Sequence, residues 1–435
     1  MSQLHTLPDE ALRARLSRTL RRASSQIPWE VEVVSRRSDD AGPQYGFPPV
    51  GYDQPITVII TPNEINNRHG TGPIIKRILA GKPGILSIRS RSDWGLHDFG
   101  QWQVCLSPAP GGRAEIFQKV LRGLKGRAIG NVVCIPFLTQ DLITAIALNA
   151  CFGARLCGYI MDDQNVAVNC IPDSIMGEFL QRCSLRLVTH PELRSAYESK
   201  YDLPFHLLPA VAPHQLIPDK YSTAAALRAD RRAAMIGSIW DKSWFDSLCE
   251  IFTGSNWHID WYGNNKSPYI EMSSIKLARS GIIPHGVIPE DRLVDELCTY
   301  PFVIVPVSAL DDRESNHGVS QLSLPGRILF AVATAGIPVL IIGSERTCAS
   351  RFVSHFGVGA TTPYRKMDAL AIMSQLLDPA IQSEIRKNIV KIAHRLSDVD
   401  IVSWLDESIA IGGPADLRFE ELFTNYGGTS AATAG

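Results

Sequence analysis

The 435-residue sequence lacks an excess of charge of either sign, because 43 basic side chains are matched by 44 acidic ones and the formal net charge is −1. Such a chain has no global field that would attract nucleic acid, so we expect no nucleic-acid partner. The sequence also lacks a run of about 18 apolar residues, which a membrane-spanning helix requires. Met1–Glu10 lacks the basic and then apolar layout of a secretory signal. These absences predict a cytoplasmic protein.

Paired cysteines are missing as well, because the nine cysteines include no Cys-x-x-Cys motif and are dispersed along the chain. An odd, dispersed set predicts reduced thiols rather than a disulfide framework or a zinc site. The overall composition is ordinary for a globular protein, with 45% hydrophobic and 20% charged residues. A chain of this length and composition is expected to form two or three domains with cores of normal size.

Residues 1–50 are predicted to be a basic appendage. A helical pattern at Leu12–Ile27 carries several arginines, and Ser38–Pro55 is rich in Asp, Gly and Pro, which is typical of a loop. The arginines indicate either a solvated helix face or attraction to acidic lipid headgroups. Few bulky apolar residues lie between them, which favours the solvated face. A peripheral contact with the inner face of a membrane stays open as the second hypothesis.

Two series of short apolar segments alternate with helical patterns, one over residues 51–212 and one over residues 231–412. Apolar strands that alternate with helices predict parallel sheets covered on both faces. Residues 213–230 are the predicted linker, and residues 413–435 are a predicted tail that is partly disordered. We therefore predict an α/β fold of two Rossmann-like lobes that face each other across a cleft. The expected strands are Ile56–Ile60, Ile85–Arg89, Gln103–Leu106, Asn131–Pro136, Arg155–Met161, Leu185–Thr189 and His206–Leu208, then Ala233–Ile239, His258–Tyr262, Ile282–His285, Phe302–Val307 and Pro338–Ile342.

Ligands of open α/β sheets bind beyond the carboxyl ends of the strands, so loops that follow strands are the candidate sites. In the first lobe, Gly70, Thr71 and Gly72 come directly before a helix predicted to begin at Pro73. The glycines permit close backbone approach, and a helix N-terminus offers free N–H groups to an anion or a polar sugar. The third glycine of the dinucleotide-binding fingerprint is missing, so a nicotinamide-dependent oxidoreductase is not expected.

Asp162 and Asp163 are the candidates for a catalytic role. They follow the apolar strand predicted at Arg155–Met161, and two adjacent carboxylates at such a strand end are rarely core residues. They could accept a proton from a hydroxyl group, orient a sugar or hold a cation. The alternative is that they cap a turn or a helix, which is a common role of aspartate.

Gly237, Ser238 and Lys242 lie at the corresponding place in the second lobe, between a strand that ends at Gly237 and a helix predicted to begin near Ser243. Lys242 can place an ammonium group on a phosphate that already faces helix N–H groups. The alternative is an ordinary surface lysine.

Ser323, Gly326 and Arg327 stand at the start of another predicted helix, which Gly336 ends. The guanidinium fork of Arg327 has the geometry to bind a diphosphate with two parallel hydrogen bonds. Together with Lys242, this segment predicts an anion site in the second lobe.

The stretch Leu324–Val339 resembles the donor-binding segment of GT-B-fold glycosyltransferases of bacterial glycan assembly, of the group 1 or family 4-like type. The resemblance covers about residues 55–400 and is most specific in the second lobe. The other pieces that are similar, in the same order, are Ile236–Ile239 with Lys242, His285–Pro289, Phe302–Pro306 and Gly343–Val353.

The resemblance implies a glycosyltransferase that moves a sugar from a nucleotide diphosphate-sugar to a glycan, a lipid-linked sugar or a protein. Lys242 and Arg327 would neutralise the donor diphosphate as the sugar leaves, which replaces a metal ion in this fold. Gly286 and Val287 would meet the nucleobase through backbone groups, and Gly70–Gly72 would lie near the diphosphate or the sugar. We therefore expect no cofactor and no metal beside the nucleotide-sugar substrate.

The sequence departs from the family pattern in the donor segment, where many relatives carry two glutamates. Phe330 and Ala331 stand at those helix positions, and this leaves two alternatives: a catalytically silent subunit that supports a partner transferase, and a nucleotide-sugar epimerase. The retained Lys242 and Arg327 argue against a silent subunit, and an epimerase would need more acids and histidines in the cleft. The nearest residues that could replace the glutamates are Asp311, Asp312, Glu314 and His317.

Overall fold

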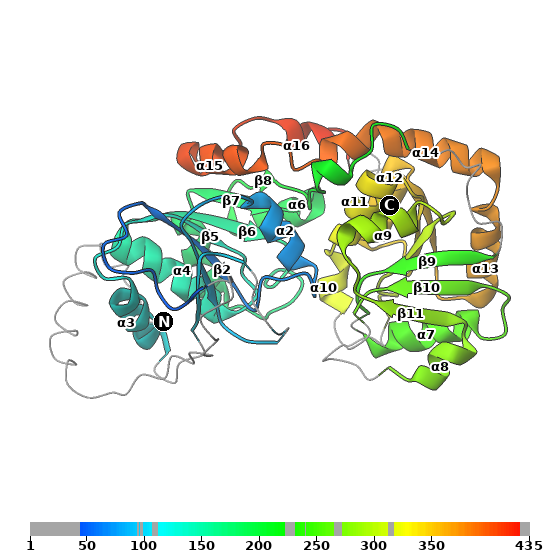
Figure 1. Cartoon of the computed structure of the whole chain (residues 1–435), viewed down its shortest axis with the longest axis horizontal. Helices are drawn as coiled ribbons and strands as arrows, with labels where there is room; N and C mark the ends of the chain where they lie inside the picture. Colours follow the sequence, from blue (N-terminus) through cyan, green and yellow to red (C-terminus); the bar gives the residue numbers. More distant parts are fainter. Residues whose placement is uncertain are drawn as a thin grey trace.

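The computed structural model describes residues 44–93, 95, 99–106, 112–221, 231–239, 241–264, 272–311 and 317–426. These residues form two α/β lobes that lie side by side along the long axis of the molecule (Figure 1). Most of the predicted appendage lies outside the described residues, and so do residues 222–230 of the predicted linker and residues 427–435 of the predicted tail. Among the helices that are described, none is long and apolar enough to cross a membrane.

The first lobe contains a parallel sheet of eight strands in the order β1-β4-β3-β2-β5-β6-β7-β8. Strand β2 (Ile56–Thr61) is buried along its whole length, as a central strand between two layers of helices is expected to be. Helix α4 (Thr139–Phe152) is also buried on most sides, which explains its nearly uninterrupted apolar sequence. The other elements are β1 (Gln44–Tyr45), α2 (Thr71–Ile78), β3 (Ile85–Arg89), β4 (Trp102–Cys105), α3 (Gly112–Leu124), β5 (Ile129–Cys134), β6 (Arg155–Ile160), α5 (Asp173–Arg182), β7 (Leu185–Val188), α6 (Pro191–Tyr201) and β8 (His206–Leu207).

The second lobe contains a parallel sheet of six strands in the order β11-β10-β9-β12-β13-β14. This is the strand order of a dinucleotide-binding sheet, and the first lobe repeats it once the short edge strand β1 is set aside. The elements are β9 (Arg232–Ile236), α7 (Lys242–Phe252), β10 (His258–Tyr262), α8 (Ser274–Arg279), β11 (Ile282–Gly286), α9 (Glu290–Leu297), β12 (Val303–Pro306), α10 (His317–Gln321), α11 (Gly326–Phe330), a π-helical turn (Ala331–Ala335), β13 (Val339–Ile342), α12 (Cys348–Phe356), β14 (Gly359–Thr362), α13 (Lys366–Gln375) and α14 (Pro379–Ala393).

The strands predicted in both lobes are confirmed, with ends that differ by a few residues. Strand β14 was not predicted, because Gly-Ala-Thr-Thr carries no apolar run and the strand lies at the sheet edge. The helix predicted after Pro325 is present, but it changes from α to π geometry at Ala331 before Gly336 ends it with a φ of 58°. The predicted helix at Pro73 begins two residues earlier, at Thr71.

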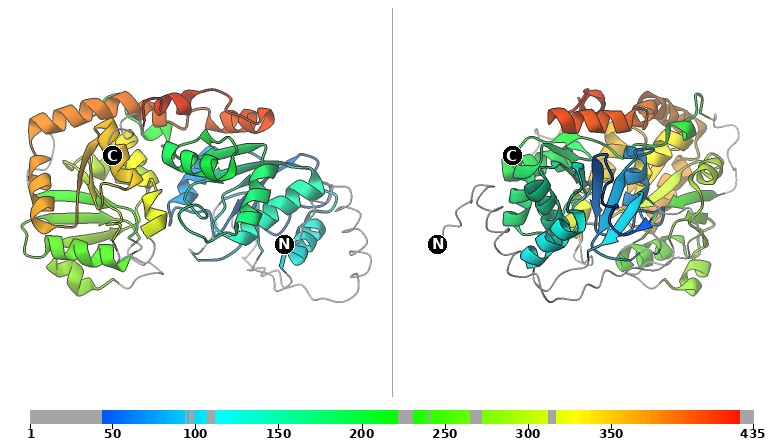
Figure 2. Two further views of the ribbon diagram at one scale, coloured as in Figure 1. Left: turned by 180° about the vertical axis from the view of Figure 1, so that it is seen from behind. Right: turned by 60° about the vertical axis from the view of Figure 1, so that its left-hand side comes forward.

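Helices α15 (Ile401–Ile411) and α16 (Arg418–Leu422) return from the second lobe to the first (Figure 2). Asp406 of α15 pairs with Lys82, and Glu420 of α16 pairs with Arg194 at 2.5 Å. The sequence pattern assigned residues 401–412 to the second lobe and the following residues to a partly disordered tail. The packing instead attaches both helices to the first lobe, because α15 lies against α2 and β6.

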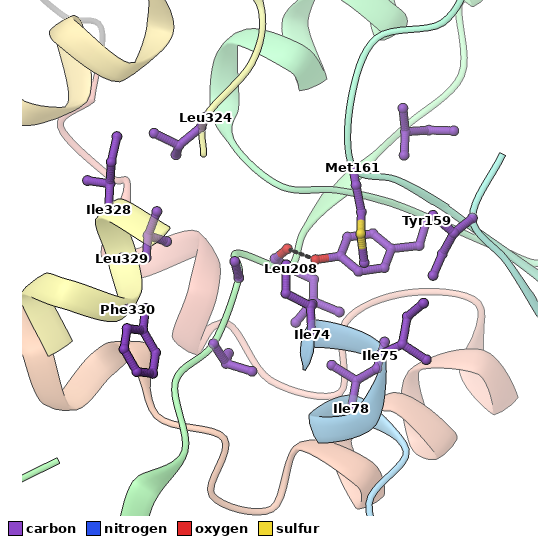
Figure 3. Packing of buried hydrophobic residues seen from close by; sticks show 14 of the residues in the cluster. Ile74, Ile75, Ile78, Tyr159, Met161, Leu208, Leu324, Ile328, Leu329 and Phe330 are labelled. Atoms are coloured by element: carbon purple, nitrogen blue, oxygen red, sulfur yellow. Dashed lines mark hydrogen bonds between the residues drawn. The ribbon is translucent and has the colours of Figure 1, made fainter. Parts of the chain in front are cut away.

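The two lobes meet at the carboxyl ends of their central strands. Arg77 of α2 pairs with Glu290 of α9, donates to the carbonyl oxygen of Val211 at 2.9 Å and lies 5.7 Å from the centre of the Phe330 ring. Apolar side chains close the rest of this junction around the chain at Leu208 (Figure 3). The loops that follow the strands therefore come together between the lobes.

Candidate anion site between the lobes

Arg327 lies where the strand order of the second lobe reverses. Its guanidinium donates hydrogen bonds to the carbonyl oxygens of Ser238, after β9, at 2.9 Å and of Pro306, at the end of β12, at 3.1 Å. Its Nε–H is buried, and no described residue accepts a hydrogen bond from it. Burial lowers the pKa of Arg327 to about 10, so the side chain stays charged at neutral pH. A partly buried cation held by carbonyl groups at a switch point favours binding of an anion.

Two glycines make room for this arginine. Gly237 has a φ of 87°, and a Cβ at that position would lie 2.2 Å from a terminal guanidinium nitrogen of Arg327. A Cβ at Gly263 would in turn lie 2.1 Å from the carbonyl oxygen of Gly237. At Gly237 the backbone therefore lies directly against Arg327, and the neighbouring Ser238 supplies a carbonyl acceptor.

Lys242 is the first residue of α7, whose N-cap Asp241 accepts a hydrogen bond from the backbone of Ser243 at 2.8 Å. The Lys242 side chain is 63% exposed, and its ammonium pairs with Asp246, which also pairs with Lys276 at 2.7 Å. The predicted contact with a phosphate requires Lys242 to leave Asp246. That exchange costs little, because an exposed pair one helical turn apart contributes only about 0.3–0.5 kcal/mol.

Asp162 and Ser323 meet across the lobe boundary. Asp162 follows β6 of the first lobe, and its Oδ1 accepts a hydrogen bond from the Ser323 hydroxyl of the second lobe at 3.0 Å. Burial raises the pKa of Asp162, the hydrogen bond from Ser323 opposes this rise, and the charge of Asp163 adds to it. Because Ser323 precedes Arg327 by only four residues, the candidate catalytic carboxylate of Asp162 and the candidate anion site belong to the same part of the molecule.

Asp163 is fully buried and points away from that junction. Its two oxygens accept hydrogen bonds from four successive backbone N–H groups, at 2.7 to 3.2 Å, and from the Tyr197 hydroxyl at 3.1 Å. This is the turn-capping role that stood as the alternative for this pair. The geometry leaves the catalytic hypothesis to Asp162, because the oxygens of Asp163 are taken up by its own loop.

The loop after β2 carries the predicted Gly-Thr-Gly segment. Gly70 is exposed, and a Cβ there would meet nothing within 4 Å, so a ligand can approach its backbone. Gly72 is required for packing instead, since a Cβ there would lie 1.9 Å from the carbonyl oxygen of Asn66. His69, which the sequence pattern did not single out, precedes them, and burial lowers the pKa of its ring. A neutral histidine in this loop is a second candidate proton acceptor.

Of the predicted nucleobase contacts, Gly286 is the last residue of β11 and Val287 follows it. Val287 is 50% exposed, and a Cβ at Gly286 would meet nothing within 4 Å, so this backbone is open to a ligand. A cavity of about 570 Å³ opens beside the loop, a size in the usual range for small-molecule sites. Its lining consists of Arg232, Asp260, Tyr262, His285, Ile288, Arg292, Asp295, Glu296 and Tyr300.

Asp260 lies at the back of this cavity and is 1% exposed. It pairs with Arg232, accepts a hydrogen bond from Tyr300 at 2.9 Å and lies 2.7 Å from His285 Nε2. Burial alone would raise the pKa of Asp260, but hydrogen bonds from Arg232, His285 and Tyr300 outweigh burial and lower it to about 2. Sequence reasoning missed this network, although an aspartate in the middle of the otherwise apolar strand His258–Tyr262 was the available signal.

In Asp260→Asn, the free energy of unfolding is expected to fall less between about pH 4 and pH 2 than it does in the wild type. Because the folded pKa lies below the ordinary value of 3.8, the ionised carboxylate stabilises the fold above about pH 4, and this contribution of about 2 kcal/mol is lost as the pH falls towards 2. Urea unfolding of both proteins at a series of pH values measures the difference. The exposed Asp53→Asn serves as the control, and parallel curves for wild type and Asp260→Asn would contradict the expectation.

The two helix positions at which the resemblance leads one to expect glutamates are closed to a ligand. Ala331 is fully buried and Phe330 is 7% exposed, with Arg77 over its ring. Of the proposed substitutes, Asp312, Glu314 and the side chain of His317 lie outside the described residues, and Asp311 is the last described residue before them.

No protein-family model matches the sequence, and no curated protein matches it. Solved structures do match. HepE from Anabaena, determined in complex with UDP and glucose, is 14% identical over 82% of this chain and 99% of that chain, with a TM-score of 0.54. MurG from Acinetobacter baumannii is 11% identical over 81% of this chain and 100% of that chain, with a TM-score of 0.49. WaaG, a glycosyltransferase involved in lipopolysaccharide biosynthesis, is 13% identical over 82% of this chain and 99% of that chain, also with a TM-score of 0.49. At such identities the likeness concerns the fold alone, and the predicted fold class is confirmed: the chain has the GT-B fold of two Rossmann-like lobes.

Proposed function

We propose that the chain is a glycosyltransferase that transfers a sugar from a nucleotide diphosphate-sugar to an acceptor. The observation that carries this proposal is the partly buried guanidinium of Arg327, held at the switch point of the second lobe by two carbonyl oxygens. A diphosphate supplies the negative charge and the paired acceptors that such a guanidinium binds. HepE, which has the same fold, was determined with UDP and glucose bound, and this supports the choice of ligand.

Charge neutralisation by side chains is the proposed means of catalysis. As the bond between the sugar and the diphosphate breaks, negative charge develops on the leaving diphosphate, and Arg327 and Lys242 stabilise it there without a metal ion at the diphosphate. The nucleobase lies against Gly286 and Val287, at the mouth of the Asp260 cavity. Asp162 removes the proton of the acceptor hydroxyl or orients the sugar, depending on whether the anomeric carbon is inverted or retained.

The acceptor enters through the first lobe, where the backbone of Gly70 is open and Asp162 faces the junction. A glycan, a lipid-linked sugar and a protein all remain compatible with this entry. Closure of the lobes over the donor would exclude water and protect the donor from hydrolysis. For a lipid-linked acceptor, contact of the basic residues 1–50 with a membrane surface would bring enzyme and acceptor together.

Calorimetric titration of the full chain with UDP, GDP, TDP and ADP tests the proposal. We expect micromolar binding of one of them, because a buried guanidinium and a helix N-terminus both favour a diphosphate. The identity of the ligand that binds also names the nucleotide of the donor. A folded chain that binds none of the four would rule out the transferase and favour the catalytically silent subunit, which the buried Phe330 and Ala331 support.

A further inference from the structure

One face of the first sheet carries polar side chains near its carboxyl edge. Ser87 and Arg89 lie two residues apart on β3 and therefore point to the same face, and Gln103 of β4 lies beside Ser87 in the register of the two strands. Ile88 and Val104 point to the opposite face and belong to the apolar core. The three polar side chains are buried, since Ser87 and Gln103 are 1% exposed and Arg89 is 6% exposed. Their hydrogen bonds therefore matter for the free energy of this face.

The guanidinium of Arg89 is paired only with neutral groups. Its Nε donates to the Ser92 hydroxyl and its Nη1 to Gln103 Oε1, each at 3.2 Å, and it forms no ion pair with a carboxylate of the described residues. The buried Arg386 differs, because it donates to the carbonyl oxygen of Gly336 at the end of a helix, where the carbonyl groups carry negative charge. A buried charge without such compensation costs free energy.

Two buried donor groups on the same face have no acceptor. Because a guanidinium only donates, the amide oxygen of Gln103 faces Arg89, and this assigns the remaining atom of the amide as Nε2. Gln103 Nε2 and Ser87 Oγ are both buried, and neither has a hydrogen-bond partner in the part of the chain that the structure describes. Buried polar groups are normally hydrogen-bonded. Two free donors beside an uncompensated cation therefore indicate a ligand that carries negative charge and several acceptor atoms.

We propose that Arg89, Ser87 and Gln103 bind a phosphate group of the acceptor. A phosphate supplies negative charge and several oxygens, and a guanidinium fork binds it through paired hydrogen bonds. The Ser87 hydroxyl and the Gln103 amide donate to its other oxygens. Arg89 is the last residue of β3, at the carboxyl edge of the sheet, and ligands of α/β sheets bind at that edge.

The assignment to the acceptor rests on the proposed function, in which the first lobe holds the acceptor. Strand β3 is separated from β6, which Asp162 follows, by β2 and β5. With neighbouring strands about 4.8 Å apart, the phosphate lies roughly 14 Å from Asp162 along the sheet edge. The phosphate is therefore not the group that receives the sugar. It is a second feature of the acceptor, and it selects an anionic acceptor over a neutral one.

Calorimetric titration of the full chain with inorganic phosphate is the first test, with the donor site saturated by the nucleoside diphosphate that the wild type binds. Arg89→Met is expected to weaken phosphate binding at least about tenfold, because hydrogen bonds to a charged group are lost, and Ser87→Ala by a smaller factor. Arg155→Met removes an exposed arginine at the start of β6 and is the matched control, with wild-type binding. Unchanged binding in Arg89→Met, or a folded wild type that binds no phosphate, overturns the anion site.

Glucose 6-phosphate distinguishes a phosphate carried by a sugar acceptor from a free phosphate ion. Tighter binding of glucose 6-phosphate than of inorganic phosphate supports the acceptor, because the sugar adds contacts in the first lobe. Equal or weaker binding overturns the assignment to the acceptor. A chain that binds phosphate but none of the nucleoside diphosphates would contradict the proposed function and leave the anion site in place, so the two failures are distinguishable.

Thermal unfolding gives a second readout. Arg89→Met is expected to fold, because an apolar side chain replaces an uncompensated buried cation. Phosphate stabilises proteins in general by exclusion from their surface, and a bound phosphate adds to this effect. The rise in Tm with phosphate is therefore expected to be larger in the wild type and in Arg155→Met than in Arg89→Met. Equal rises in all three proteins contradict the site, and Ser87→Ala takes the place of Arg89→Met if that variant does not fold.

Discussion

Arg327→Met is expected to weaken nucleoside diphosphate binding by about 100-fold, because truncation of one member of a buried, hydrogen-bonded charge pair costs about 2–5 kcal/mol. Methionine keeps most of the aliphatic stem but cannot donate to the carbonyl oxygens of Ser238 and Pro306 or to the ligand. Calorimetric titration with the diphosphate that binds the wild type measures the change. Arg327→Lys keeps the charge but loses the planar guanidinium fork, so its affinity for the diphosphate is expected to lie between that of the wild type and that of Arg327→Met.

Arg386→Lys is the matched control for this series. Arg386 is also a buried arginine, and its guanidinium donates to the carbonyl oxygen of Gly336 at 2.7 Å, away from the loops after β9 and β12. Its replacement should change stability and leave diphosphate binding as it is. If Arg327→Met bound the diphosphate with wild-type affinity, the diphosphate would have to bind elsewhere, and the main support for the proposed function would be lost.

Asp162→Asn is expected to lower the rate of sugar transfer by about 100-fold or more, since a positioned general base contributes about 10²–10⁴-fold. Asparagine keeps the shape of the side chain and an oxygen that can accept from Ser323, so the lobes should stay joined. The readout is acceptor-dependent release of nucleoside diphosphate from the donor that the titration identifies. Binding of the diphosphate itself should stay unchanged, which separates a chemical role from a structural one.

Two comparisons make the Asp162 result informative. Asp53→Asn removes an exposed carboxylate from the same lobe and should release diphosphate at the wild-type rate. His69→Gln removes the other candidate proton acceptor, whose neutral ring lies in the loop after β2. Full activity in Asp162→Asn together with its loss in His69→Gln would transfer the role of base to His69.

The two lobes could be predicted because buried parallel strands are apolar on both faces. Strands β2 and β13 are such runs, and each stands out from the helical pattern that follows it. The return of α15 to the first lobe could not be predicted in the same way. Its apolar face shows that the helix packs against something, but not which lobe it covers, and that depends on contacts such as Asp406 with Lys82.

The candidate site was predictable in part for a similar reason. Arg327 and Lys242 stand at helix starts, where the chain itself indicates an anion site. Asp162 and Asp163 could not be told apart, since they are neighbours at the same strand end. The structure separates them, because the turn after β6 folds back over Asp163 and leaves Asp162 facing Ser323.

The contacts among His190, Glu192 and Cys348 could not be predicted from spacing in the sequence. Spacing rules cover only residues that lie close together in the chain. His190 and Glu192 belong to one lobe and Cys348 to the other, so they meet only when the lobes do. The sequence by itself determined the two series of buried strands and the cationic residues at helix starts, because burial and helix polarity act over a few residues. Only the tertiary structure decided which side chains face one another across the lobes, because those contacts join segments that are far apart in the chain.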